Sequence, residues 1–183
     1  KSVQNTQQIT KAMKMVSAAK LRRAQQAIQQ MRPYANKLND LLRNIMTAVG
    51  GSGGSSFGVE RPAKKACIVV VTSNRGLAGA FNTNVIKAAI SVINERYSDV
   101  RREGNLSLLC IGKKGYDVMR KRYPDCKIIA DHVELFHDLS FNNVAVVSRR
   151  LMDAFEAGEY DRVEVAFSRF KNAATQFSTS EQW

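Results

Sequence analysis

The first 49 residues carry one long helical pattern. Between Ser2 and Val49 there is no glycine, and the residues that favour helices, chiefly Ala, Gln, Lys, Arg, Leu and Met, predominate. In the second half of this segment, apolar residues recur at alternating spacings of three and four, which is typical of the seam of a coiled coil. The seam positions are Leu21, Ala24, Ile28, Met31, Ala35, Leu38, Leu42, Ile45 and Val49. The pattern predicts a long helix that needs a partner helix along this seam.

Two features modify this prediction. In the first half, Ile9, Met13 and Val16 form a separate apolar stripe that is out of phase with the seam, so the helix presents a different face near its start. Pro33 lies between seam positions; it removes one backbone hydrogen bond and disfavours helical geometry at Arg32. We therefore expect a kink or a local break at this point.

The pattern changes after residue 49. Residues 50–58 read GGSGGSSFG, which is the composition of a flexible linker. Short β-branched runs then alternate with amphipathic stretches. The predicted strands are 67–72, 106–111, 127–131 and 163–167, and the predicted helices run from Asn82 or Thr83 to Gly104, from 112 to 123 and from 142 to 157. This alternation predicts a mostly parallel sheet covered by helices, a Rossmann-like α/β domain.

Capping residues and the spacing of apolar positions predict further details of two of these helices. Asn82 or Thr83 is expected to cap the first helix of the domain, because short polar side chains bond the free N–H groups of a helix start. The last helix should turn its apolar positions toward the sheet. These positions are Val144, Val147, Leu151, Ala154 and Phe155.

The size of the two parts predicts how the chain is organised. About 45 helical residues at about 1.5 Å each extend for roughly 70 Å, whereas a compact domain of the remaining length has a radius of gyration of only about 14 Å. The helix must therefore project beyond the domain, and its seam must be covered by a second chain or by a missing part of this one. We interpret the chain as a fragment with a helix at 1–49, a linker at 50–62, an α/β domain at 63–176 and the start of a truncated C-terminal region at 177–183.

Composition and charge narrow the class of protein. Of the 183 residues, 44% are hydrophobic and 24% are charged, as in globular proteins, and no apolar string approaches the roughly 20 residues that cross a bilayer. The net charge of +12 is uneven, because residues 1–49 hold nine Lys or Arg and a single acid, Asp40. The partner of this segment should be acidic: nucleic acid, anionic lipid or an acidic protein surface.

Candidate catalytic and metal sites are weak. Gly76 and Gly79 after the first strand give only G-x-x-G, not the G-x-G-x-x-G of a dinucleotide site, which favours a tight structural turn. The loop residues His132, Glu134, His137 and Asp138 lack the spacing of a helical zinc site and are interpreted as exposed. Three cysteines without C-x-x-C spacing are interpreted as reduced structural thiols: Cys67, Cys110 and Cys126. We expect no catalysis by this chain alone, no cofactor and no metal.

Three strings carry a resemblance to a known family. They are SVQNTQQITKAMKMV with its continuation SAAKLRRAQ from Ser2, SNRGLAGAFN from Ser73 and RFKNAATQ from Arg169. Together they closely resemble the gamma chain of F-type ATP synthase (the F1 part, CF(1) in chloroplasts), most closely its bacterial form. The resemblance runs over essentially the whole chain. One departure is Asn74, where the family often has Asp.

The resemblance implies a rotor shaft. In this family, an N-terminal and a C-terminal helix form an antiparallel coiled coil inside the hexameric ring of alpha and beta subunits. The Rossmann-like foot joins the epsilon subunit and the membrane c-ring. The chain would couple proton-driven rotation to conformational change at the beta subunits without binding nucleotide itself. It would lie peripherally at the cytoplasmic face of the bacterial inner membrane, reaching the membrane only through the complex.

The resemblance also implies contact residues on the helix. Lys11, Met13 and Lys14 would lie near the acidic lever of a beta chain, with Met13 as a pliable apolar contact and the lysines as electrostatic guides. Lys20, Arg22 and Arg23 would contact the stator lever or polar loops near the ring.

Two other classes of function remain open at this stage. One is a Rossmann-like nucleotide-binding enzyme with a helical dimerisation arm, which would bind a nicotinamide or flavin cofactor. The other is a basic nucleic-acid-binding module, which would use clusters such as Arg101 and Arg102 or 120–122. Neither class explains the two apolar stripes of the first helix as well as a shaft does.

Overall fold

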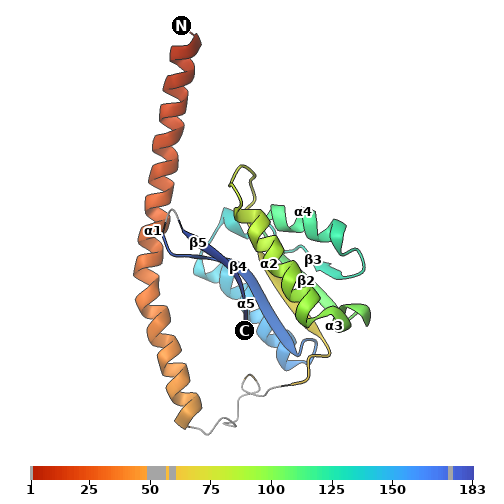
Figure 1. The fold of residues 1–183 in the computed structure, drawn as a ribbon. Helices are drawn as coiled ribbons and strands as arrows, with labels where there is room; N and C mark the ends of the chain where they lie inside the picture. Colours follow the sequence, from red (N-terminus) through yellow and green to blue (C-terminus); the bar gives the residue numbers. More distant parts are fainter. Residues whose placement is uncertain (1, 49–56, 58–60, 173–174) are drawn as a thin grey trace. The chain divides into compact units, whose positions relative to one another are not determined.

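The structure is a computed structural model that describes residues 2–48, 57, 61–172 and 175–183. The chain divides into two compact units, residues 1–58 and residues 59–183. The first unit contains a single long helix, and the second contains a sheet with helices on both faces (Figure 1). The predicted linker at 50–62 falls mostly outside the described residues.

The long helix α1 spans Ser2–Ala48 and has 47 residues. Its extent confirms the prediction from the glycine-free segment; only the last seam position, Val49, lies outside the described residues. Of the kink or local break expected at Pro33, the break does not occur, because the helix continues through this residue. A proline inside a helix costs about 3 kcal/mol, and the good helix formers on both sides of Pro33 extend the helix far enough to outweigh this cost.

The second unit is built on a five-stranded sheet in the order β3-β2-β1-β4-β5. Its strands are β1 (Ala66–Val71), β2 (Leu106–Ile111), β3 (Lys127–Ile129), β4 (Arg162–Phe170) and β5 (Gln176–Gln182). The first four are parallel, and β5 returns antiparallel to β4. The order 3-2-1-4 confirms the Rossmann-like prediction. The sequence patterns did not predict β5.

Helices cover both faces of this sheet. One face packs on α2 (Phe81–Arg96), α3 (Ser98–Arg102) and α4 (Lys113–Arg122) through a core that includes Ile68, Ile93 and Leu108. The other face packs on α5 (Phe141–Glu156) through a smaller core that includes Val69 and Leu151. The continuous apolar sequences of β1 and β2 are explained by this arrangement, because both strands are covered on both sides.

Three local predictions are wrong. The helix expected up to Gly104 is broken at Tyr97, whose φ of −124° leaves helical geometry and separates α2 from α3. Neither Asn82 nor Thr83 caps α2; the cap position is Ala80, and the Asn82 side chain instead bonds Ser73. Val144 of α5 is exposed rather than inward, because the helix begins over the edge of the sheet and only reaches the core at Val147.

Candidate functional site

The surface of α1 is the first candidate for function. Most of its apolar residues remain exposed, in the early stripe and in the seam alike: Met13 is 65% exposed and Ile45 is 56% exposed, whereas the seam residue Ile28 is half-buried. A stripe of this kind on an isolated helix is unusual, since the apolar face of a stable helix is normally buried against another element. The exposed seam therefore marks a surface for a helical partner.

The predicted contact residues lie on different sides of α1. Successive helical residues are about 100° apart around the axis, so Lys11 and Met13 lie on nearly opposite sides. Lys20 falls on the side of Met13, and Arg22 falls on the side of Lys11. All six predicted contact residues are exposed: Lys11, Met13, Lys14, Lys20, Arg22 and Arg23. All six residues lie in the first half of α1, but they do not form a single surface patch.

The turn between β1 and α2 is the second candidate. In a nucleotide site at this place, backbone N–H groups at a helix start would be free to bind phosphate. Here the Phe81 N–H, the first of α2, donates to the Ala78 carbonyl within the turn itself. The turn also holds the start of α4: Lys113 N–H donates to Asn74 Oδ1, Lys114 N–H to the Ser73 carbonyl and Gly115 N–H to Thr72 Oγ1. The interpretation of the glycines as a structural turn agrees with this geometry.

The tip of the same turn carries a feature that the sequence analysis missed. Leu77 is fully exposed and has a φ of +58°, which makes it the only non-glycine residue with positive φ among those described. Left-handed geometry is costly for a leucine, and exposure of its side chain adds a further penalty. The signal in the sequence is an apolar residue enclosed by Gly76 and Gly79.

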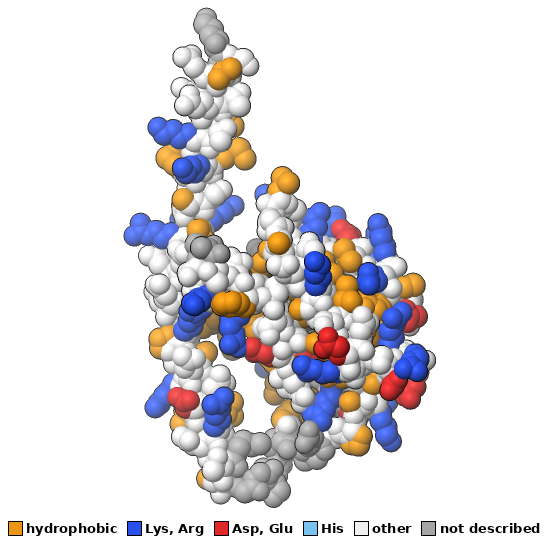
Figure 2. Space-filling model, viewed as in Figure 1, with side chains coloured by type: hydrophobic (Ala, Val, Ile, Leu, Met, Phe, Trp, Pro, Cys, Tyr) orange, Lys and Arg blue, Asp and Glu red, His pale blue; other side chains and the backbone are white. Residues whose placement is uncertain are grey.

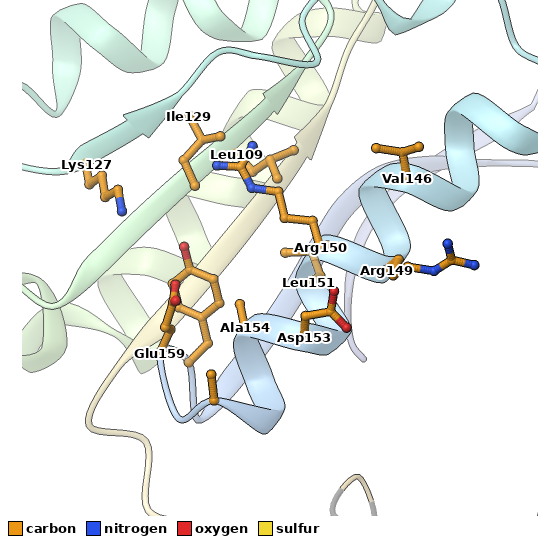
Figure 3. A pocket seen from close by; sticks show the side chains of 12 residues that line it. Leu109, Lys127, Ile129, Val146, Arg149, Arg150, Leu151, Asp153, Ala154 and Glu159 are labelled. Atoms are coloured by element: carbon orange, nitrogen blue, oxygen red, sulfur yellow. The ribbon is translucent and has the colours of Figure 1, made fainter.

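A hollow of about 610 Å³ lies between α5 and strands β2 and β3. In Figure 3, Leu109 and Ile129 lie at the sheet, Lys127 and Arg150 project from opposite sides, and Glu159 and Asp153 lie below them. The hollow is lined on its helical side by α5 residues such as Val146 and Leu151. Its charges are mixed, and no nucleophile paired with a base lines it, so the hollow does not indicate catalysis.

The thiols and the histidine loop also carry no active site. All three cysteines are free and buried, which confirms their structural interpretation. Burial raises the pKa of the Cys67 thiol to about 12 and that of Cys110 to about 12, so both stay protonated and unreactive. In the loop, Glu134 binds His137 Nε2 at 3.1 Å and accepts from Asn74 at 2.9 Å. No group of three metal-binding side chains occurs in the described residues.

His132 is the partial exception in this loop, because it is half-buried rather than exposed. Its burial and the nearby Arg150 lower the pKa of the imidazole. The neutral ring is therefore favoured, as expected for a histidine at the margin of a core.

A long helix with an exposed apolar seam, joined by the chain to a Rossmann-like unit, defines a class of protein that needs a helical partner. The chain belongs to the ATP synthase family, whose model matches residues 1–183. Among curated proteins, it is 48% identical over 182 residues to the ATP synthase gamma chain of Cytophaga hutchinsonii and 45% identical over 181 residues to that of Geobacter sp.. These matches cover 100% and 99% of this chain and 61% of each relative. The resemblance to the gamma chain is confirmed.

Solved structures agree with this family. The central stalk and c-ring of the Tetrahymena thermophila mitochondrial ATP synthase contain a chain that matches 96% of this one with a TM-score of 0.68 and 23% identity, covering 71% of that chain; this likeness shows the fold alone. The rotor of the Euglena gracilis enzyme gives a TM-score of 0.58 and 26% identity over 96% of this chain and 56% of that one. None of the helices in the described residues is long and apolar enough to span a membrane.

Proposed function

We propose that this chain is part of the central rotor shaft of an ATP synthase and couples ring rotation to conformational change at catalytic beta subunits. The observation that carries the proposal is the exposed seam of α1. The chain spans 61% of the length of its relatives, so a returning helix in the remaining part would have the length to cover the seam as an antiparallel coiled coil. In this proposal, the chain itself catalyses no reaction.

The distribution of charge on α1 supports this role. Basic residues near its start point to several sides of the helix, whereas a helix on the surface of one domain has its charges on one face. A shaft surrounded by partners needs contacts all round. Met13 and Lys20 would face one neighbour while Lys11 and Arg22 face another, so each beta subunit would meet a different side of the shaft and be biased toward a different nucleotide affinity.

The α/β unit would serve as the foot of the rotor. In this proposal it contacts the epsilon subunit and the membrane c-ring, and it places the chain at the cytoplasmic face of the bacterial inner membrane. The similar chain in the rotor of the Euglena gracilis mitochondrial ATP synthase supports membership of such an assembly. The exposed Leu77 at the tip of the β1–α2 turn would contact another subunit.

The proposal is tested by Met13→Lys in the complete ATP synthase complex. A new lysine facing an acidic lever would form a close charge pair worth roughly 1.5 kcal/mol or more, which favours one orientation of the shaft about tenfold. We expect fewer protons pumped per ATP hydrolysed, with assembly less affected. The measurement is the pumping ratio in membrane vesicles beside the amount of assembled complex.

Gln26→Lys is the matched control, because it adds the same charge to an exposed position of α1 outside both apolar stripes. It should leave the pumping ratio unchanged. If Met13→Lys also leaves the number of protons pumped per ATP unchanged, Met13 has no role in coupling. Failure of the chain to enter the complex at all would overturn the shaft proposal itself.

A further inference from the structure

Six basic residues cluster at one edge of the α/β unit, where strands β2 and β3 begin. They come from the end of α3, the end of α4 and the first residue of β3; we call this cluster the basic edge, and it consists of Arg101, Arg102, Arg120, Lys121, Arg122 and Lys127. A pair of hydrogen bonds from Arg101 to Asp125, at 2.8 and 3.0 Å, ties the end of α3 to the segment that follows α4. In Figure 2, Lys and Arg side chains are numerous where Figure 1 draws α3 and α4, with acidic side chains between them.

The ion pairs within the basic edge leave most of its charge uncompensated. Arg101 pairs with Asp125, and Arg102 pairs with Asp99 at 2.5 Å. In the part of the chain that the structure describes, the other four residues form no ion pair: Arg120, Lys121, Arg122 and Lys127. The C-terminal dipole of α4 attracts its three terminal cations, but it amounts to only about half a negative charge. A net positive surface remains.

The aromatic residues of the basic edge distinguish between polyanionic partners. Arg101 stacks on the Tyr123 ring at 4.5 Å, and Arg120 stacks on the Tyr116 ring at 5.1 Å. Both rings are therefore covered, and Tyr123 is buried. Single-stranded nucleic acid is bound by exposed rings on which bases stack, and this surface offers none. It fits a partner that presents many phosphates and no bases.

We propose that the basic edge binds the anionic headgroups of a phospholipid bilayer. Only the choice of a membrane over other phosphate-rich surfaces rests on the proposed function, in which the foot of the rotor lies next to the membrane ring. Clustered basic residues are attracted to an anionic bilayer, and each contributes about fivefold to the affinity. The attraction weakens as salt is raised, because it falls off within the Debye length.

The test uses the full chain and vesicles of phosphatidylglycerol and phosphatidylcholine whose phosphatidylglycerol headgroups carry a quencher. Asn105→Cys places a fluorophore beside the basic edge without removing a basic residue, and Thr83→Cys places one on α2 at the opposite edge of the sheet; both positions are exposed. The three native thiols are buried, so labelling is selective. Local quenching separates the contact of this edge from any binding through the basic helix α1.

We expect quenching at position 105 but not at position 83, only with phosphatidylglycerol present. Arg120→Gln combined with Arg122→Gln should shift the half-point of quenching by about 30-fold in lipid concentration. Neutralising Lys37 and Arg43, two exposed residues of α1, as Gln is the matched control and should leave the quenching pattern local to position 105. Trp183 fluorescence confirms that each variant is folded.

Equal quenching at both positions, or none at position 105, would overturn the proposal. So would a DNA duplex at equal phosphate concentration that binds the basic edge more tightly than the vesicles do. The assay needs no other subunit, so its failure would leave the shaft proposal standing, and a failed coupling test would not affect this result.

Discussion

The two units of the chain differ in where their apolar side chains go. In the α/β unit, alternate residues of β1 and β2 enter two cores on opposite faces of the sheet. In α1, large apolar side chains such as Met31 and Leu42 remain more than half exposed. In folded proteins, a helix gains most of its stability from packing against another element. The α/β unit therefore contains the source of its own stability, whereas α1 depends on a partner.

The largest loss of stability in the α/β unit is expected when a side chain is added at Gly112. Its φ is +95°, and an added Cβ would lie 2.0 Å from the Thr72 carbonyl oxygen, which belongs to the backbone and cannot move aside. We expect Gly112→Ala to destabilise the unit by about 4 kcal/mol, the range of the most damaging substitutions. The measurement is urea unfolding followed by the fluorescence of Trp183, the only tryptophan, whose backbone N–H donates to the Val163 carbonyl.

Gly104 provides the control for this prediction. It also has positive φ, at +74°, but an added Cβ would meet nothing within 4 Å. Gly104→Ala should therefore cost only about 1 kcal/mol, the price of left-handed geometry. Equal losses in the two variants would show that conformation, and not the contact with Thr72, decides the role of Gly112.

A smaller effect is expected at the buried carboxylate of the α/β unit. Glu164 is completely buried and binds Arg96 at 2.5 Å, with the Tyr97 hydroxyl donating at 3.3 Å. Arg96→Met should cost about 2 kcal/mol, because it leaves a buried charge without its cation. This is below the usual loss for a broken buried pair, since the Arg96 side chain is itself half exposed.

The double variant separates charge from packing at this pair. Adding Glu164→Gln to Arg96→Met removes the unpaired charge and should restore most of the lost stability. Urea unfolding of the two single variants and the double variant gives the coupling between them. Additive losses would mean that Arg96 acts through the packing of its side chain rather than through its charge.

The smallest effect is expected in α1 and completes the comparison. Leu38→Asp places a charge on the seam, at an exposed position. In the chain alone it should change the unfolding free energy of the α/β unit by less than about 0.5 kcal/mol, because the two units are compact separately. A large change in the Trp183 transition would contradict the independence of the two units.

Much of the fold could be predicted because most elements have strong local patterns. The strand at 106–111 was predicted to the residue, since its apolar run is bounded by turn residues. The edge strand β5 was missed: its sequence QFSTSEQ is mostly polar, and its position is set by pairing with β4 rather than by a local pattern. Tyr97 likewise ends α2 because its side chain enters the core, which no spacing rule reveals.

The candidate site was less predictable for a physical reason. A functional surface that contacts other chains has no internal partner to impose a pattern on it. The seam of α1 was visible because coiled-coil packing is periodic, and the contact residues from Lys11 to Arg23 could be proposed only through the resemblance. Leu77 has no periodic pattern on either side; its only sequence signal is its place between Gly76 and Gly79, and its exposure and backbone geometry identify it.

The hydrogen bonds at the root of the β1–α2 turn have a mechanical consequence. Thr72, Ser73 and Asn74 are fastened to the start of α4, and the Thr72 N–H is fastened to the end of β2. A load applied at the tip of the turn cannot be absorbed by bending at its root. It passes into β1 and β2, which are buried along almost their whole length, so the turn and the sheet behave as one stiff body.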